Sequence, residues 1–234
     1  LVQGRVQRTL LVFTDVTAIR EKEQQLLVKN SVIKEIHHRV KNNLNTIAGI
    51  LRMQARRAKN EEAREALRRA VDRILGISQI HDILARQSGE NVEWHQLLGR
   101  LCKLSLESLT AGSKVRLVLE NDGRPLLMGS EDAVNLAIAV NELIHNALDH
   151  GFEGLSSGTL TISEEKADGV FHLCVKNDGH LLPEGFGAKG YDLGLQIVRT
   201  LAEIELKGQF QFGNEGNQVA AHIRFPLERL EVTE

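Results

Sequence analysis

The chain has few cysteines, few prolines and few aromatic residues, and each shortage excludes a class of protein. Its two cysteines, Cys102 and Cys174, lie far apart without metal-ligand spacing, so we expect buried thiols in a reducing compartment rather than disulfides or a zinc site. Three prolines in 234 residues exclude a collagen-like chain. No apolar run approaches the roughly 20 residues that cross a bilayer, so we expect no membrane segment here.

The net charge of −2 conceals two halves of opposite sign. Residues 1–90 carry a net charge of +7, and residues 91–234 carry −9. Opposite charges indicate two modules that dock on each other or on different partners. The basic residues are spread around predicted helices without interleaved aromatic residues, which argues against nucleic-acid binding.

A regular apolar repeat dominates the first third of the chain. Four apolar residues recur every seven positions: Leu26, Ile33, Val40 and Ile47. This repeat predicts one long helix over about 18–57, close to 60 Å in length. A second amphipathic helix, capped by Asn60, is expected to end near residue 85. An antiparallel hairpin of these two helices leaves apolar surface exposed, so we expect two hairpins to pair as a homodimeric four-helix bundle.

The pattern becomes mixed after a polar linker at 87–91. Helices are predicted at 94–109, 130–150 and 192–205, and strands at 115–120, 159–163, 170–176, 209–212 and 218–225. This is an α+β module with helices on one face of the sheet, and Ser130 is expected to cap its middle helix. A strand predicted at 6–13, in a chain that begins with Leu1, leads us to expect an upstream domain.

Two adjacent histidines, His37 and His38, lie inside the predicted long helix. Neighbouring helical residues point about 100° apart, so the two face different surroundings. With Ile33 and Val40 at the first heptad position, His37 falls in the apolar stripe and His38 faces water. His38 is therefore the better acceptor for a bulky charged donor, with His37 as the alternative. A plain surface histidine beside basic residues is the simpler interpretation of this spacing alone.

A polar face is predicted on the helix over 130–150. Glu142, Asn146 and Asp149 are spaced to lie on one side, while Val140, Leu143 and Ala147 can pack on a sheet. A carboxylate and an amide one turn apart suit a base and an oxygen ligand to Mg²⁺.

A second polar element follows a strand. Asp178-Gly179 comes directly after it, and a glycine-rich loop with Gly190 and Gly194 leads into the next helix. The free N–H groups at a helix start favour phosphate.

In this order, the motifs resemble those of bacterial two-component sensor histidine kinases, especially the subfamily with a His-His-Arg-Val-Lys-Asn-Asn motif related to the HWE kinases. Residues 37–44 resemble the H box, 141–147 the N box, 178–179 the start of the first glycine box, and 190–198 the second glycine box. Asp15-Val16-Thr17 resembles the end of a PAS sensor domain.

The resemblance implies three segments. Residues 1–19 would end a PAS-like sensor and linker, 20–90 would form the dimerisation and histidine phosphotransfer hairpin, and 91–234 would form an α+β Bergerat-type (GHKL) ATP-binding sandwich. The implied function is that of a cytoplasmic ATP-dependent protein-histidine kinase, which autophosphorylates with ATP and Mg²⁺. It would then pass the phosphoryl group to an aspartate of a response regulator receiver domain.

The resemblance also assigns roles to residues. His38 would be the phosphoacceptor, Glu142 the catalytic group that orients or deprotonates it, and Asn146 the Mg²⁺ ligand. Asp178 would accept from the adenine amino group, and Gly179 would allow close approach. The remaining ATP-binding positions would be His150, Lys189, Gly190, Leu193 and Gly194, with Lys189 neutralising the γ-phosphate.

The sequence departs from the family pattern after Asp178-Gly179, where a second glycine is usual and His180-Leu181-Leu182 follow. This departure favours, as an alternative, a degenerate non-catalytic dimeric scaffold of the same family. A third hypothesis is an ATPase of the superfamily without histidine chemistry, which the H box opposes.

Overall fold

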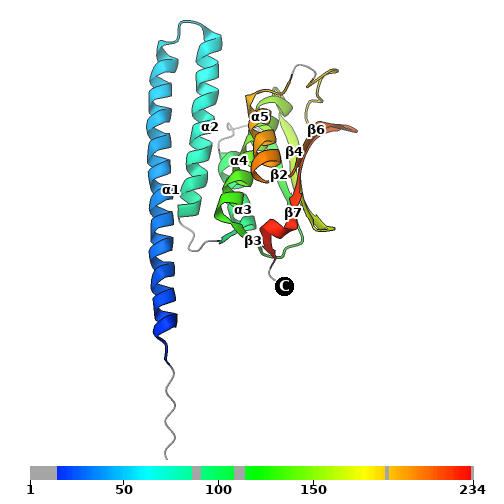
Figure 1. The fold of residues 1–234 in the computed structure, drawn as a ribbon. Coiled ribbons are helices and arrows are strands. Elements are labelled where there is room, and N and C mark those ends of the chain that lie inside the picture. The colour runs from blue at the N-terminus through cyan, green and yellow to red at the C-terminus, as the bar shows by residue number, and fades with distance from the viewer. Residues whose placement is uncertain (1–14, 86–90, 108–113, 188–189, 233–234) are drawn as a thin grey trace, which may run out of the picture.

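The computed structural model describes residues 15–85, 91–107, 114–187 and 190–232. A long helical hairpin stands beside a domain of helices packed on a sheet (Figure 1). The strand predicted at 6–13 and the candidate residue Lys189 lie outside the described residues. No described helix is both long enough and apolar enough to cross a membrane.

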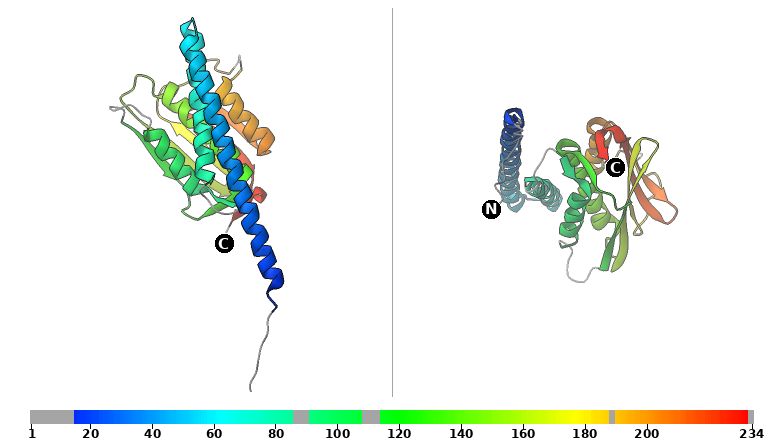
Figure 2. Two further views of the ribbon diagram at one scale, coloured as in Figure 1. Left: turned by 90° about the vertical axis from the view of Figure 1, so that its left-hand side faces the viewer. Right: turned by 90° about the horizontal axis from the view of Figure 1, so that it is seen from below.

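The hairpin and the α+β domain form successive layers. Helix α2 (Glu61–Ala85) lies between α1 (Thr17–Arg57) and the helices of the domain, and the sheet lies on the far side of those helices (Figure 2). Helix α2 packs on the domain through Ile80, Ile83 and Leu84, which join its buried core. The domain therefore packs on α2 rather than on α1.

The hairpin combines a predicted cap with polar pairs between its helices. Asn60 Oδ1 accepts a hydrogen bond from the Ala63 N–H at 2.7 Å, so the predicted cap is confirmed. Three polar pairs then join α1 to α2: the Nδ1 atoms of His37 and His81 at 2.9 Å, Lys41 Nζ with Asp82 Oδ1 at 2.5 Å, and Ser78 Oγ with Asn45 Oδ1 at 3.1 Å. Polar pairs of this kind favour one register of the two helices.

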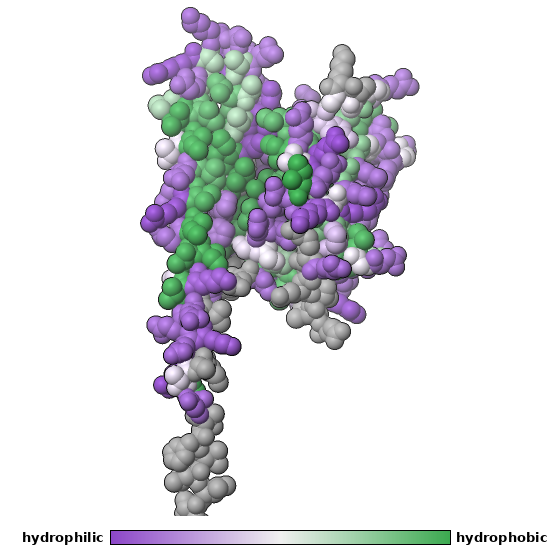
Figure 3. Space-filling view, in the orientation of Figure 1, coloured by the Kyte–Doolittle hydropathy of each residue, from purple (hydrophilic) through white to green (hydrophobic). Residues whose placement is uncertain are grey.

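One side of α1 remains apolar and uncovered. We call this the outer apolar face of α1, formed by Val28, Val32, Ile36, Ile47, Ile50 and Met53, each between 45% and 57% exposed. Apolar residues gather along the length of the hairpin in the space-filling view (Figure 3). Among the described residues of α1, only Ala48 and Ala55 are buried apolar side chains.

The described residues of the domain form two sheets. The larger has the order β2-β4-β5-β7-β6, with β2 parallel to β4 and the other pairs antiparallel; the smaller has the order β1-β3-β8. The strands are β1 (Asn91–Glu93), β2 (Lys114–Glu120), β3 (Leu126–Gly129), β4 (Ser157–Ala167), β5 (Val170–Asn177), β6 (Gln209–Glu215), β7 (Gln218–Pro226) and β8 (Leu230–Val232). The three short strands of the smaller sheet were absent from the sequence prediction.

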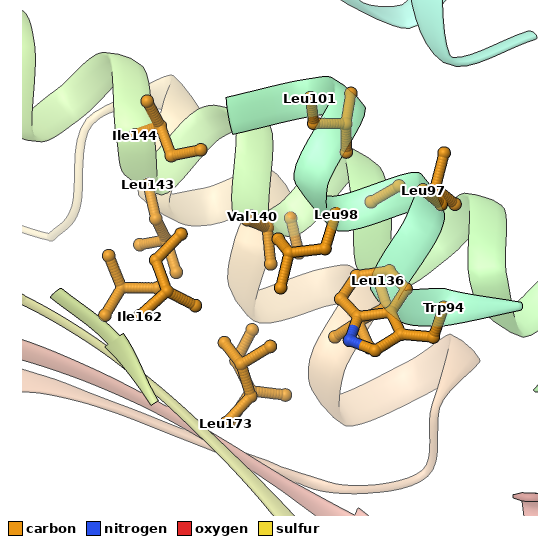
Figure 4. Close-up of a cluster of buried hydrophobic side chains, with 14 of the residues drawn as sticks. Trp94, Leu97, Leu98, Leu101, Leu136, Val140, Leu143, Ile144, Ile162 and Leu173 are labelled. Carbon is orange, nitrogen blue, oxygen red and sulfur yellow. The ribbon is translucent and has the colours of Figure 1, made fainter. Parts of the chain in front are cut away.

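The core lies between the larger sheet and three helices. These are α3 (Trp94–Glu107), α4 (Ser130–Asn146) and α5 (Leu193–Thr200). Side chains from α3 and α4 meet Ile162 of β4 and Leu173 of β5 in one buried cluster (Figure 4). Cys102 and Cys174 are both buried, as predicted, and burial raises the pKa of their thiols to about 12 and about 11.

The structure corrects the predicted ends of two helices. Ser130 does not cap α4: Gly129 holds the cap position without a side-chain hydrogen bond, and Ser130 is already helical. The α-helix also ends at Asn146, and the chain continues as a π-helical turn, η1 (Ala147–Gly151). A second π-helical turn, η2 (Leu201–Glu205), follows α5. Sequence periodicity does not distinguish these wider turns from an α-helix.

Candidate active site

The polar face predicted on α4 lines a cavity of about 450 Å³ between α4 and α2. Glu142, Asn146 and Asp149 all border it, so their predicted common face is confirmed. His150 and Gly194 border the same cavity. Helix α2 contributes Arg69, Asp72, Arg73, Leu75, Gly76 and Gln79. The hairpin therefore forms one wall of the candidate site.

Glu142 is the most enclosed charged group of this cavity, with its side chain 5% exposed. Arg73 Nε of α2 donates to Glu142 Oε2 at 2.7 Å. Burial raises the pKa of Glu142, and the Arg73 guanidinium partly offsets that rise. A buried carboxylate with a raised pKa is suited to accept a proton near neutral pH.

The start of α5 forms the opposite side of the cavity. Asp192 caps α5, because its Oδ1 accepts from the Leu195 N–H at 2.9 Å. A Cβ at Gly194 would lie 3.1 Å from Arg73 Nη2 and 3.2 Å from Glu142 Oε2. Glycine at this position therefore leaves room for the ion pair against the first turn of α5. Gly190 precedes that turn at a φ of 92°, and the side chain of Leu193 is 62% exposed.

The first glycine box lies away from this cavity. Asp178 Oδ1 accepts from the Thr159 N–H at 2.6 Å, and its side chain is exposed. A Cβ at Gly179 would lie 2.0 Å from the Gly151 carbonyl oxygen. Glycine is therefore required where the end of β5 packs on η1. Neither Asp178 nor Gly179 is among the described residues that line the cavity.

The two histidines of α1 face in different directions. His37 is 7% exposed and contacts His81, whereas His38 is exposed, as its heptad position predicted. No described residue of α1 lines the cavity, because α2 stands between them. The structure thus brings together Glu142, Asn146 and Gly194 but leaves His38 on another side of the hairpin.

Sequence reasoning missed the wall that α2 contributes to the cavity, including Arg73, and it assigned no role to Asn141. Arg73 is one of many basic residues on α2, and nothing in its spacing distinguishes it. Asn141 is 4% exposed, and its Nδ2 has no hydrogen-bond partner within the described part of the chain. This amide faces Gly76 of α2, where a Cβ would lie 2.6 Å from Nδ2.

Two families of known proteins match successive parts of the chain. Residues 35–109 match the family described as histidine kinase, and residues 131–229 match the histidine kinase-, DNA gyrase B-, and HSP90-like ATPases. The expected fold class, a helical segment followed by an ATPase domain of this type, is confirmed.

Curated relatives point in the same direction. The sensor histidine kinase PdtaS of Mycolicibacterium smegmatis is 38% identical over 207 residues, which cover 88% of this chain and 41% of that protein. PdtaS of Mycobacterium tuberculosis is 37% identical over 210 residues, which cover 89% of this chain and 42% of that protein. The chain therefore spans less than half the length of these relatives.

A solved structure shares the fold. The histidine kinase domain of the blue-light activated histidine kinase EL346 from Erythrobacter litoralis matches with a TM-score of 0.56 at 24% identity, covering 88% of this chain and 95% of that one. With two family models that together match most of the chain, and relatives that align along nearly all of it, the chain belongs to the histidine kinases.

Proposed function

We propose that this chain is the kinase core of a sensor histidine kinase that phosphorylates itself on His38 from ATP and passes the phosphoryl group to an aspartate of a response regulator. One observation carries the proposal: an exposed histidine on a helical hairpin stands beside an ATPase-type domain whose Glu142 and Asn146 face that hairpin. Bound ATP supplies the γ-phosphoryl group.

His38 acts as the nucleophile in this proposal. The lone pair on one imidazole nitrogen forms an N–P bond, while the bond from the γ-phosphorus to the bridging oxygen breaks and ADP leaves with that electron pair. The proton on the other ring nitrogen passes to the Glu142 carboxylate, whose burial favours proton uptake. His37 is held against His81, which keeps the neighbouring His38 turned toward solvent.

The donors around the cavity fit Mg²⁺ and a polyphosphate. Mg²⁺ prefers a small number of protein oxygens together with phosphate oxygens and water, and the Asn146 amide can supply one such oxygen. The first turn of α5, at Gly194, offers backbone N–H groups to phosphate. His150 borders the same space from η1, and Gly190 and Leu193 lead into α5. Lys189 completes the proposed set as the cation near the γ-phosphate.

Asp178 would hold the adenine end. One of its carboxylate oxygens is fixed by the Thr159 N–H, which leaves the other to accept from an adenine amino group. Gly179 keeps the adjoining backbone close to η1. The free carboxylate oxygen of Asp178 supports an active kinase over a degenerate scaffold.

The proposal includes a homodimer through the hairpin. The outer apolar face of α1 carries six large apolar side chains, each about half exposed. A second hairpin would cover such a stripe in a four-helix bundle. The same proposal places the chain in the cytoplasm, where ATP and receiver domains occur, downstream of a PAS-type sensor.

Labelling with Mg²⁺ and γ-labelled ATP tests the proposal. Wild type and His37→Gln are expected to gain acid-labile, base-stable label, whereas His38→Gln is expected to gain none. Glutamine at 37 is the matched control because its amide can still bond His81. Label retained in His38→Gln would overturn the assignment of the acceptor. ATP binding without label in the wild type would favour the scaffold, and ADP release without label would favour a plain ATPase.

A further inference from the structure

We propose that the ion pair between Arg73 and Glu142 is an autoinhibitory latch, which docks the ATPase domain on α2 and withholds Glu142 from His38. The inference rests on the proposed role of Glu142 as the group that serves His38. It assigns a function to Arg73, Gly76 and Asn141, none of which belongs to the proposed set of ATP-binding residues.

The Arg73 guanidinium is bonded to the carboxylate that the proposed mechanism requires. Arg73 Nε donates to Glu142 Oε2 at 2.7 Å, and the side chains of the two residues are 21% and 5% exposed. The Glu142 side chain is almost fully enclosed between α4 and α2, and one of its two oxygens is already bonded to the guanidinium. While Arg73 is docked, Oε2 is therefore withheld from His38, and the carboxylate faces α2 rather than the exposed side of α1.

Arg73 of the hairpin lies close to both α4 and α5, the two helices of the proposed nucleotide site. A Cβ at Gly194 would lie 3.1 Å from Arg73 Nη2, 3.2 Å from Glu142 Oε2 and 3.7 Å from Asp192 Oδ1. Arg73 thus contacts α4 and lies against the first turn of α5, where the polyphosphate is proposed to bind. When docked, the guanidinium occupies space beside that binding site.

The docked domain is also at the wrong height for phosphoryl transfer. His37 pairs with His81, so the level of His38 on the hairpin corresponds to residue 81 of α2. Arg73 is eight residues earlier, or about 12 Å along the helix axis at 1.5 Å per residue. In a two-fold symmetric bundle the two copies of His38 lie at the same level along the bundle axis. The separation of about 12 Å between Arg73 and His38 along that axis therefore holds within a subunit and between subunits.

The contact between α2 and α4 contains an unsatisfied polar group, which favours undocking of the ATPase domain. One turn from Arg73, the Asn141 amide is buried against Gly76 with its Nδ2 unpartnered within the described part of the chain. An unpaired buried donor disfavours the docked arrangement, because undocking returns the amide to water. The unpaired amide therefore reduces the free energy by which the docked state is favoured over the free state.

Gly76→Ala separates the latch from the chemistry. A methyl group there would lie 2.6 Å from Asn141 Nδ2, so the buried amide must shift, which weakens the contact between α2 and α4 without touching Glu142. Alanine also strengthens an α-helix relative to glycine, so the hairpin is expected to fold. Gly49→Ala on α1 is the matched control, because a Cβ there meets nothing within 4 Å.

Arg73→Ala removes the latch directly. Arg68→Ala is its control, because Arg68 is exposed on the same helix and pairs only with Glu61 and Glu65 in the described structure. The initial rate of His38 labelling is expected to rise about fivefold or more in Gly76→Ala and Arg73→Ala, since the undocked fraction grows. Their radius of gyration by small-angle X-ray scattering is expected to exceed that of both controls.

Two results would overturn the latch. If Gly76→Ala and Arg73→Ala gain label no faster than their controls, docking does not restrain the kinase. If both lose label while binding ADP normally, the docked arrangement is the productive one. Absence of label from wild type and every variant, with ADP bound, would instead refute the proposed kinase function, and the latch with it.

Discussion

The two parts of this chain differ in how completely they bury their apolar surface. In the ATPase domain, Phe171, Leu173 and Ile223 have no exposed surface, and their neighbours form one continuous core. In α1, the large apolar side chains of the outer face are about half exposed. The domain is therefore stabilised within the chain, whereas α1 depends on a surface that the chain does not supply. The ATPase domain therefore has a complete apolar core, to which α2 contributes, whereas the acceptor helix α1 does not bury its own apolar face.

The largest effect is expected from a charge on the outer apolar face. Ile50→Asp would bury an unpaired carboxylate in the dimer and is expected to raise the dimer dissociation constant about 100-fold or more, which is roughly 3 kcal/mol. Sedimentation equilibrium measures this directly. Arg56→Asp places a carboxylate at an exposed position about 120° around the helix from Ile50 and is expected to leave the dimer intact. An unchanged dissociation constant in Ile50→Asp would place the interface elsewhere.

A smaller effect is expected where packing in the domain is tight. Gly179→Ala puts a methyl group 2.0 Å from the Gly151 carbonyl oxygen, so β5 or η1 must move, at a cost of about 1–3 kcal/mol. Urea unfolding followed by the fluorescence of Trp94, the single tryptophan, reports on this domain. In α1, Gly49→Ala meets open space and is expected to be neutral or stabilising. Equal stability of the two variants would contradict the close approach at Gly179.

The smallest effect is a difference in pH response between the two parts. Burial lowers the pKa of His81 to about 4, below its ordinary value of 6.5, and burial also lowers the pKa of His37. The neutral form is favoured in the folded state, so its stabilising contribution is complete above pH 6.5 and is lost as the pH falls toward 4. Since both rings are partly exposed, the loss is about 1 kcal/mol.

Two spectroscopic signals distinguish the loss of hairpin stability at low pH from any change in the stability of the ATPase domain. Far-ultraviolet circular dichroism is dominated by the long helices, whereas Trp94 fluorescence follows the domain. As the pH is lowered from 7 to 5, the unfolding temperature of the helical signal is expected to fall further in wild type than in His81→Asn. The asparagine amide can still bond His37, but it does not titrate. The Trp94 transition should shift equally in both proteins. Identical helical transitions in wild type and variant would show that the pair does not titrate in this range.

Much of the fold was predictable because it is encoded locally. The heptad spacing around Ile33 and Val40 predicted α1, the Asn60 cap predicted the start of α2, and the same periodicity separated buried His37 from exposed His38. The common face of Glu142, Asn146 and Asp149 also followed from helical spacing. The smaller sheet was missed because strands of three or four residues have too little alternation to detect.

The candidate site was less predictable because it is assembled from distant segments. Arg73 and Glu142 are 69 residues apart, and only the docking of α2 on α4 brings them together. The requirement for glycine at 179 likewise depends on the π-helical turn η1, which no local pattern indicates. The motif resemblance located Asp178 correctly after its strand but carried no information about which cavity it borders.

The unbroken course of α1 has a consequence for linker length. From Thr17 to His38 the helix runs about six turns without interruption. Each residue inserted ahead of Thr17 as helix therefore rotates whatever precedes it by about 100° relative to His38. Seven residues complete nearly two whole turns and restore the original facing to within about 20°. Input domains joined to this core are thus expected to regulate it with a seven-residue period in the length of the connecting helix.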